Sequence, residues 1–473
     1  MIKSVALYFL ANILPQSIAF LLLPIYSLYM SLEEFGIISA LETVTNIFMV
    51  FVSLNLYRSS SRFYFSTQDQ NERRIILGTF FWGSFLISLI FCGIAFISNN
   101  LLTSIFPSIP FWPFYALTIL TVIFTSLPRI ILVYYQVSEQ PSKYLKLNVL
   151  KTFLILGSIL LFVVYFEKGA LGQIIGLFTA ALILAPICFY IAWKQFDFTI
   201  NWTILREGLS FSWPFIPTLL MSWVLSLSDR IFIERMLSLE DLGIYGMGYK
   251  ISSILLIISG AISLAYSPQF YKIANEQSIQ IAKEKIKAYS DVLIPLLILF
   301  TFALSLFAWE IVTFSLDEKY LPSLPIIRII LLAHLLSSIL SITSNLYFYQ
   351  AKKTFLHMLS YIFACLIKLI LNYFLILELG LIGAALASVI SAIVLVIIHY
   401  NLSRQSFFIA IGWPKILSLI LICSTLLGVV ENIEATNLAI SLLSKIIFIS
   451  ILIFYIYKNS NLKTFLNDNR KRA

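Results

Sequence analysis

The sequence has few charged residues, few cysteines and few histidines, and each shortage excludes a class of protein. Only 12% of its 473 residues are charged, which is about half the share of an ordinary soluble domain. The four cysteines and three histidines are dispersed along the chain, so they predict neither a disulfide framework nor a zinc site. Composition excludes a soluble enzyme, a nucleic-acid-binding protein and a disordered scaffold. We expect no metal, no cofactor and no nucleic-acid partner.

Hydrophobic residues, by contrast, make up 60% of the chain. A membrane-spanning helix needs roughly 20 apolar residues, so this content would supply on the order of fourteen helices. The sequence therefore predicts an all-α integral membrane protein, and its N-terminal run is expected to be a retained first helix rather than a cleaved signal peptide. The expected spans lie near residues 5–30, 37–56, 75–98, 113–136, 147–166, 170–193, 211–233, 244–266, 291–313, 325–350, 358–378, 381–401, 416–431 and 438–457.

Basic residues divide unevenly between the loops on the two sides of these spans. The loops alternate in side along the chain, and the set that includes both termini holds 23 lysines and arginines. The other set holds only Lys168, Arg235 and Lys319. Because loops rich in lysine and arginine remain in the cytoplasm, we expect both termini in the cytoplasm and the loop at 99–112 outside.

A polar motif occurs twice in the chain. MSLEEFGI at 30–37 recurs as LSLEDLGI at 237–244, and six predicted helices separate the copies. An even number of helices gives both halves the same orientation, as in parallel repeats related by an axis along the membrane normal. We expect two six-helix lobes, residues 1–206 and 207–404, with a cavity between them and alternating access by rocking. Residues 405–473 would form two additional helices and a basic cytoplasmic tail.

Three stretches of the chain resemble a known family. They are Pro24 followed by SLEEFGI, then WPFIPTLL at 213–220 with SDRIFIERMLSLEDLGIYGMGYK at 228–250, and finally KLILNYFLILELGLIGAALAS at 368–388. On these residues the chain resembles the MOP (multidrug/oligosaccharidyl-lipid/polysaccharide) exporter superfamily, which has the MATE-like fold. Within that superfamily it is most similar to the Wzx-type flippases of polysaccharide repeat units, such as O-antigen units.

The resemblance implies a transporter and not an enzyme. The implied activity is alternating-access translocation of an undecaprenyl-pyrophosphate-linked oligosaccharide across the bacterial cytoplasmic (inner) membrane, for assembly of a surface polysaccharide such as lipopolysaccharide. Implied partners are this lipid-linked oligosaccharide, membrane lipids, a coupling ion (H+ or Na+) or the membrane potential, and a polysaccharide polymerase complex. An ion-coupled exporter of small organic cations is the alternative on the same fold. A polysaccharide polymerase or ligase is disfavoured because every predicted outer loop is short.

Charged residues inside the predicted spans are the candidates for substrate binding, because a charge at that depth costs about 2.5–3.5 kcal/mol on insertion scales. Lysine and arginine suit a pyrophosphate, lysine as a point charge and arginine as a bidentate fork. The sugars are expected to meet hydroxyl, amide and aromatic groups such as Tyr245 and Trp223. Structural pairing inside the bundle, or anchoring at the membrane surface, is the alternative for each cation. The expected substrate-binding residues are Lys250, Lys368, Arg129, Arg58 and Arg62.

Three further charged residues are expected to form ion pairs or a gate. By the repeat, Glu42 and Lys250 have nearly equivalent depths in the second and eighth helices. Opposite charges at close approach in a partly dry site attract by a few kcal/mol, at an effective dielectric constant of about 20. Glu42 and Lys250 are therefore expected to pair and close the outer side of the cavity. Asp229 and Arg230 are expected to form a local ion pair that orients the seventh helix.

Overall fold

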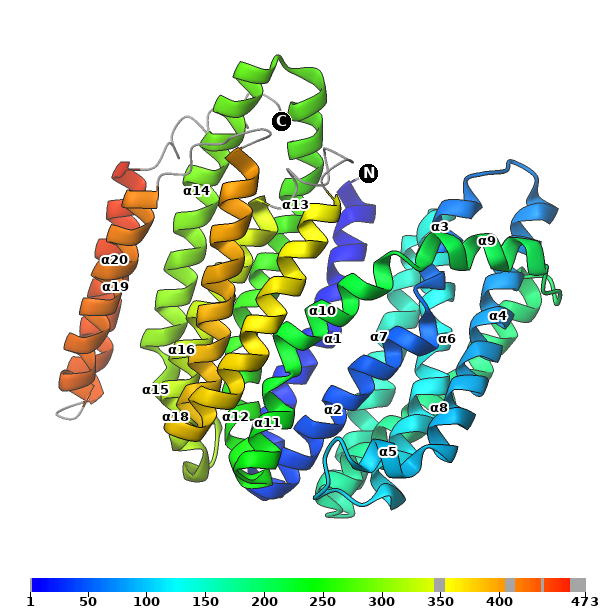
Figure 1. Ribbon diagram of the computed structural model, residues 1–473, viewed down its shortest axis with the longest axis horizontal. Coiled ribbons are helices and arrows are strands. Elements are labelled where there is room, and N and C mark those ends of the chain that lie inside the picture. Colours follow the sequence, from blue (N-terminus) through cyan, green and yellow to red (C-terminus); the bar gives the residue numbers. More distant parts are fainter. Residues whose placement is uncertain (1, 344–353, 405–412, 435–437, 460–473) are drawn as a thin grey trace. The chain divides into compact units, whose positions relative to one another are not determined.

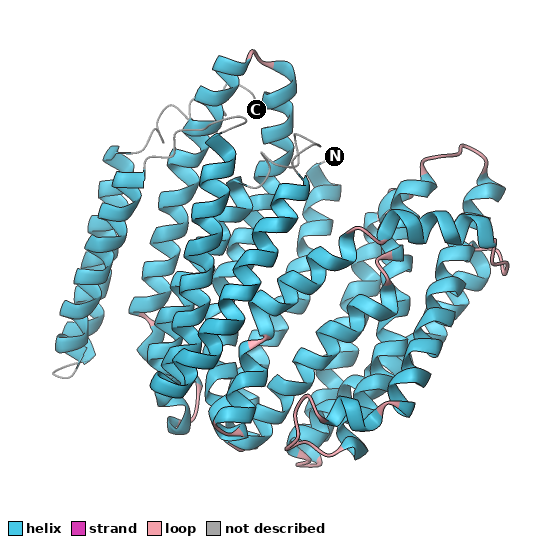
Figure 2. Cartoon of the chain, in the orientation of Figure 1, coloured by secondary structure: helices cyan, strands magenta, loops and turns pink. Residues whose placement is uncertain are grey.

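The computed structural model is helical almost throughout (Figure 2). It describes residues 2–343, 354–404, 413–434 and 438–459, and it has no strand in these ranges. The chain divides into two compact units, Met1–Met247 and Gly248–Ala473. The all-α fold is therefore confirmed. The expected lobe boundary at residues 206 and 207 stays a prediction, and the basic tail after residue 459 lies outside the described residues.

The first unit is a helical bundle (Figure 1), and its longest helices are apolar enough to cross a membrane. Within it α6 packs against α4 and α8, and α7 packs against α1 and α8. Its helices are α1 (Ile2–Tyr29), α2 (Leu32–Ser53), α3 (Leu56–Tyr64), α4 (Gln70–Ile97), α5 (Asn99–Thr103), η1 (Phe111–Tyr115), α6 (Ala116–Val137), α7 (Pro141–Ile159), η2 (Leu160–Tyr165), α8 (Gly169–Gln195), α9 (Trp202–Ser212), α10 (Phe215–Leu227), α11 (Asp229–Met236) and most of α12 (Leu239–Ser252).

The second unit is a bundle in which α16 packs against α13, α14 and α18, while α19 and α20 pack against α14. The long helix α18 is broken at Gly380, where φ is 57°. Its two arms correspond to the predicted spans 358–378 and 381–401. The helices that begin in this unit are α13 (Ile254–Glu276), α14 (Ile279–Leu306), α15 (Ala308–Ser315), η3 (Glu318–Ser323), α16 (Leu324–Thr343), α18 (Thr354–Arg404), α19 (Trp413–Glu434) and α20 (Leu438–Asn459).

Ten helices of the described residues are long and apolar enough to cross a membrane, or eleven if the bent pair Trp202–Ser212 and Phe215–Leu227 is counted as one span. Two shorter apolar helices, Ser418–Gly428 and Ser441–Tyr455, lie where the last two spans are expected. A multi-pass membrane protein is therefore confirmed, whereas the number of fourteen spans stays a prediction.

Both copies of the repeated motif begin a helix. The Ser31 hydroxyl accepts a hydrogen bond from the Glu34 backbone N–H at 3.1 Å, and the Glu34 carboxylate accepts one from the Ser31 N–H at 2.9 Å. The Ser238 hydroxyl likewise accepts from the Asp241 N–H at 3.0 Å and donates to the Asp241 carboxylate at 2.6 Å. Serine followed three residues later by an acid satisfies the open N–H groups of a helix start. The polar residues of the motif therefore have a structural role.

The glycines of the motif let α2 and α12 pack with their backbones in contact. A Cβ atom on Gly36 would collide with the carbonyl oxygen of Leu239, and a Cβ atom on Gly243 would collide with that of Leu32. Leu32 and Leu239 are themselves equivalent in the repeat, so the contact is reciprocal. The two copies of the motif therefore contact each other through equivalent residues.

Two hydrogen bonds of the first unit join segments that the sequence predicts as loops on the same side. On one side the Asp197 N–H donates to the Arg74 carbonyl at 3.1 Å. On the other side the Ser108 N–H donates to the Glu234 carboxylate at 2.9 Å. Each contact joins two loops that the alternation assigns to the same side. The assignment of one of these sides to the cytoplasm stays a prediction.

Candidate functional site

The short helix α3 carries two of the predicted basic residues and follows a break in the second predicted span. Leu54 and Asn55 both have left-handed backbone conformations, with φ of 37° and 59°. The break turns the chain so that α3 packs on α9. Ser59 lies at this contact, where its hydroxyl donates to the Gly208 carbonyl at 2.8 Å and lies 2.5 Å from the Ser212 hydroxyl.

Arg58 and Arg62 on α3 lie over aromatic rings. The Arg58 guanidinium is 5.3 Å from the centroid of the Phe215 ring, and the Arg62 guanidinium is 4.3 Å from that of Phe211. An arginine stacked on an aromatic face keeps the N–H donors in the plane of its guanidinium group available to an anion. The two arginines are therefore held in place by rings, with donors left for a phosphate.

Arg129 on α6 and Lys151 on α7 form a pair of like charges inside the first unit. Both side chains are half-buried, and the charge on Arg129 acts on the Lys151 ammonium. Arg129 also lies 5.9 Å from the centroid of the Tyr57 ring. In the described part of the chain, neither cation has a carboxylate within ion-pair distance. Charges at membrane depth normally pair with one another or with backbone carbonyls, so this pair suits an anionic ligand.

Lys151 was not among the residues expected to bind substrate, because it was assigned to a cytoplasmic loop. The helix α7 begins at Pro141 and carries proline at its start, the position that proline favours. Lys151 therefore lies ten residues into the helix, or about 15 Å along its axis. Its position within the expected span 147–166 was the signal that could have made it a candidate ligand.

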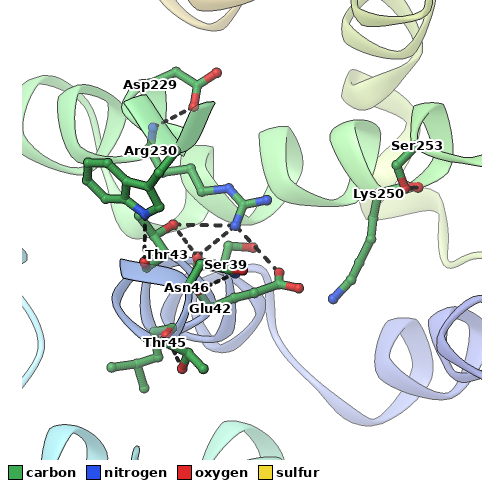
Figure 3. Close-up of polar contacts among 11 residues, drawn as sticks. Ser39, Glu42, Thr43, Thr45, Asn46, Asp229, Arg230, Lys250 and Ser253 are labelled. Atoms are coloured by element: carbon green, nitrogen blue, oxygen red, sulfur yellow. Dashed lines mark hydrogen bonds and ion pairs between the residues drawn. The ribbon is translucent and has the colours of Figure 1, made fainter. Parts of the chain in front are cut away.

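Arg230 on α11 is bound to α2 through its guanidinium (Figure 3). Its Nη1 atom donates to the Ser39 carbonyl at 3.1 Å and to the Thr43 hydroxyl at 3.4 Å, and it lies 3.5 Å from the Glu42 carboxylate. Arg230 is buried, whereas the Glu42 side chain is 39% exposed. Trp223 on α10 adds a hydrogen bond of 3.0 Å from its Nε1 atom to the Thr43 carbonyl. These contacts fasten α10 and α11 to α2.

The expected pairings of Asp229 and Glu42 can be compared with these contacts. The buried Asp229 carboxylate accepts hydrogen bonds from the Tyr245 hydroxyl at 2.5 Å and from the Arg230 backbone N–H at 3.0 Å. The structure thus shows a contact of Asp229 with the main chain of Arg230, while the Arg230 guanidinium points to Glu42. The predicted pair of Glu42 with Lys250, a residue of the second unit, stays a prediction.

The other two predicted cations lie in the second unit. Lys368 is buried, with 1% of its surface exposed, and its ammonium donates to the Ser388 hydroxyl at 3.0 Å. This bond joins the two arms of α18. Lys250 lies near the end of α12 and is half-buried. Their roles as substrate ligands stay predictions.

A buried ion pair in the second unit was not anticipated from the sequence. The Lys445 ammonium on α20 lies 2.6 Å from the Glu310 carboxylate on α15. Both side chains are buried. This ion pair links α20 to α15 within the second unit.

The chemistry available in the first unit is the binding of anions. Six cations lie along α3, α6 and α7, and four of them face aromatic rings. Among the described residues, no group of three or more histidine, cysteine or acidic side chains could hold a metal ion.

The sequence and the structure of the chain are both similar to those of known proteins. The chain is 22% identical to a protein of the Lsg locus of Haemophilus influenzae over 329 residues, which cover 67% of this chain and 78% of that protein. Its structure is similar to the lipid II flippase MurJ in an inward closed conformation, with a TM-score of 0.71, 17% identity and coverage of 97% of this chain and 99% of that chain.

A second solved structure is an inward-facing multidrug resistance MATE family transporter of the MOP superfamily. It matches with a TM-score of 0.62 and 14% identity, over 87% of this chain and 95% of that chain. At these identities the two structures establish the fold, which is the one expected from the resemblance. A family model described as polysaccharide biosynthesis protein matches residues 1–274, more than half of the chain. The chain therefore belongs to the polysaccharide biosynthesis protein family.

Proposed function

We propose that this protein is a flippase that moves an undecaprenyl-pyrophosphate-linked oligosaccharide across the bacterial cytoplasmic membrane for assembly of a surface polysaccharide. The observation that carries the proposal is the pair of cations Arg129 and Lys151, which lie inside the first unit without a carboxylate partner among the described residues. A pyrophosphate supplies the missing negative charge. Charge-assisted hydrogen bonds to phosphate oxygens are roughly twice as strong as neutral ones.

The proposed path of the head group uses the basic residues in order of depth. Arg58 and Arg62 receive the pyrophosphate from the cytoplasmic leaflet, and Arg129 with Lys151 holds it deeper in the bundle. Arginine contributes two parallel donors and lysine a compact point charge. Lys250 and Lys368 are the proposed ligands from the second unit, and Lys368→Ala should then abolish export.

Translocation itself would proceed by alternating access, through rocking of repeat-related halves. The proposed gate combines the pair of Glu42 and Lys250 with the Asp229 and Arg230 cluster on the outer side. Both termini would lie in the cytoplasm, a coupling ion (H+ or Na+) or the membrane potential would drive transport, and a polysaccharide polymerase complex would use the product.

Export of small organic cations is the second candidate, because a multidrug transporter shares the fold. The charges in the first unit support the anionic substrate. Arg129 and Lys151 would repel an organic cation, whereas they attract a pyrophosphate. The anionic substrate is therefore favoured.

Complementation of a gene deletion tests the proposal. Loss of the gene should remove surface polysaccharide and cause lipid-linked units to accumulate on the cytoplasmic face. Arg129→Gln and Lys151→Gln should each reduce rescue by about tenfold or more, the loss expected for one charged hydrogen bond. Lys146→Gln is the matched control, because Lys146 is an exposed lysine of the same helix α7. Normal polysaccharide in the deletion strain, or equal rescue by all three variants, contradicts the proposal.

A further inference from the structure

The first unit contains a cavity of about 870 Å³ where the end of α3, the start of α4 and α9 meet. Arg62 lines it from α3, Glu72 from α4 and Glu207 from α9. Its other walls include Phe65, Ile75 and further apolar side chains. The cavity therefore combines charges of both signs with an apolar lining.

Arg62 and Glu207 have opposite charges but do not neutralise each other. In the described part of the chain, neither has a carboxylate or cation within ion-pair distance. The Arg62 guanidinium lies over Phe211, which follows Glu207 by four residues, or about 6 Å along the axis of α9. Both charged side chains thus line the cavity from neighbouring helices. A ligand with a cation and an anion at a short separation could contact both.

Glu72 is less available than Glu207. The Thr67 hydroxyl donates a short hydrogen bond to its carboxylate, and Glu72 lies in the first turn of α4, where a negative charge is stabilised by the helix dipole. Glu207 has no comparable contact in the described residues and is exposed. Glu207 is therefore the carboxylate that can receive a ligand cation.

The aromatic residues around this cavity indicate its depth in the membrane. Trp193 is 81% exposed and Phe198 is 76% exposed, and both precede α9. Trp202 begins α9, Trp213 follows it, and both are also exposed. Exposed tryptophan and other aromatic side chains concentrate at the head-group level of a bilayer. We therefore expect the cavity to lie at the level of the phospholipid head groups.

We propose that the cavity binds the head group of a zwitterionic phospholipid with a primary amine, the phosphoethanolamine class. Arg62 binds the phosphate with its guanidinium donors, and Glu207 accepts hydrogen bonds from the ammonium. The apolar walls at Phe65 and Ile75 contact the glycerol and the start of the acyl chains. A choline head group has no N–H to donate to Glu207, and a glycerol head group has no cation. The site shares Arg62 with the proposed path of the transported substrate, whereas Glu207 belongs to this site alone.

The test measures lipid binding to the purified full-length protein in detergent by native mass spectrometry. The probes are phosphatidylethanolamine, phosphatidylcholine and phosphatidylglycerol with identical acyl chains. We expect phosphatidylethanolamine to bind about tenfold more tightly than the other two. Glu207→Gln should abolish this preference, while Arg206→Gln, a change of the adjacent exposed residue, should leave it intact. Arg62→Gln should weaken binding of all three lipids.

Equal binding of the three lipids overturns the proposal, as does an equal effect of Glu207→Gln and Arg206→Gln. Free phosphoethanolamine distinguishes the source of the ligand. If it competes as well as the whole lipid at the same concentration, the cavity takes a soluble compound and the lipid assignment is wrong. If only the lipid competes, the assignment stands. None of these outcomes depends on export of polysaccharide, so failure here is distinguishable from failure of the proposed flippase activity.

Discussion

Arg129 and Lys151 carry charges that repel each other between α6 and α7, and among the described residues neither has an acidic partner. We expect such an arrangement to lower the stability of the empty protein, because two like charges at membrane depth are poorly solvated. Residues that stabilise a fold are not expected to behave in this way. Functional sites commonly retain groups that reduce stability. The expected stability cost of Arg129 and Lys151 is therefore consistent with a role of this pair in binding a ligand.

Neutralising either Arg129 or Lys151 should raise the stability of the protein and lower its transport activity. We expect Arg129→Gln and Lys151→Gln to raise the thermal unfolding midpoint in detergent by about 2–4 °C, which corresponds to about 1 kcal/mol. Export should fall in the same variants. Lys146→Gln should change neither quantity. A fall in the unfolding midpoint for both variants would show that the two cations stabilise the bundle and would contradict their role as ligands.

The cluster around Arg230 should be more sensitive to loss of the arginine than to loss of the acid. Arg230→Met leaves the Ser39 carbonyl and the Thr43 hydroxyl without this donor, at a cost of about 1–3 kcal/mol. Glu42→Gln should cost less than about 1 kcal/mol, because an ion pair with an exposed partner contributes little. Denaturation of the purified variants measures both. Equal losses would mean that the ion pair, and not the hydrogen bonds to α2, holds α11.

The glycine contact between α2 and α12 should not tolerate a methyl group. Gly36→Ala and Gly243→Ala each drive a Cβ atom into a backbone carbonyl, and overpacking of this kind costs about 1–3 kcal/mol. Gly93→Ala is the control, since nothing lies within 4 Å of a Cβ atom at that helical position. Alanine there should slightly raise stability. Thermal unfolding that ranks the three variants alike would refute the close contact.

Thiol labelling in whole cells can establish the orientation. We expect Ser108→Cys to react with a membrane-impermeant reagent from outside, and Ser66→Cys to react only after the membrane is opened. Both serines are exposed, whereas all four native cysteines are buried and should react slowly. Labelling of the Ser66 position from outside would reverse the predicted topology.

The ion pair between Lys445 and Glu310 should show strong coupling. Lys445→Met leaves a buried carboxylate without its cation, which should cost about 3–5 kcal/mol. Glu310→Met should have a similar cost. The double change to methionine should be much less destabilising than either single change, because it leaves no charge to neutralise. Unfolding free energies that simply add would show that the two side chains do not interact.

Much of the architecture could be predicted from the sequence because its causes act along the chain. Apolar runs of sufficient length determine where helices cross a membrane. The serine and acid of each SLE(E/D) motif lie three residues apart, so their hydrogen bonds at the start of α2 and α12 are local. The repeat itself shows that Gly36 and Gly243 are equivalent positions, and both lie at the contact between α2 and α12.

The partners of the charged side chains, in contrast, were decided only by the tertiary structure. Arg230 contacts Glu42 across 188 residues, and Lys445 contacts Glu310 across 135. The sequence reveals how deep each charge lies, but the rotation of each helix about its axis depends on how its whole apolar surface packs against its neighbours. That rotation decides which charges meet. It is why the proximity of Lys151 on α7 to Arg129 on α6 could not be predicted.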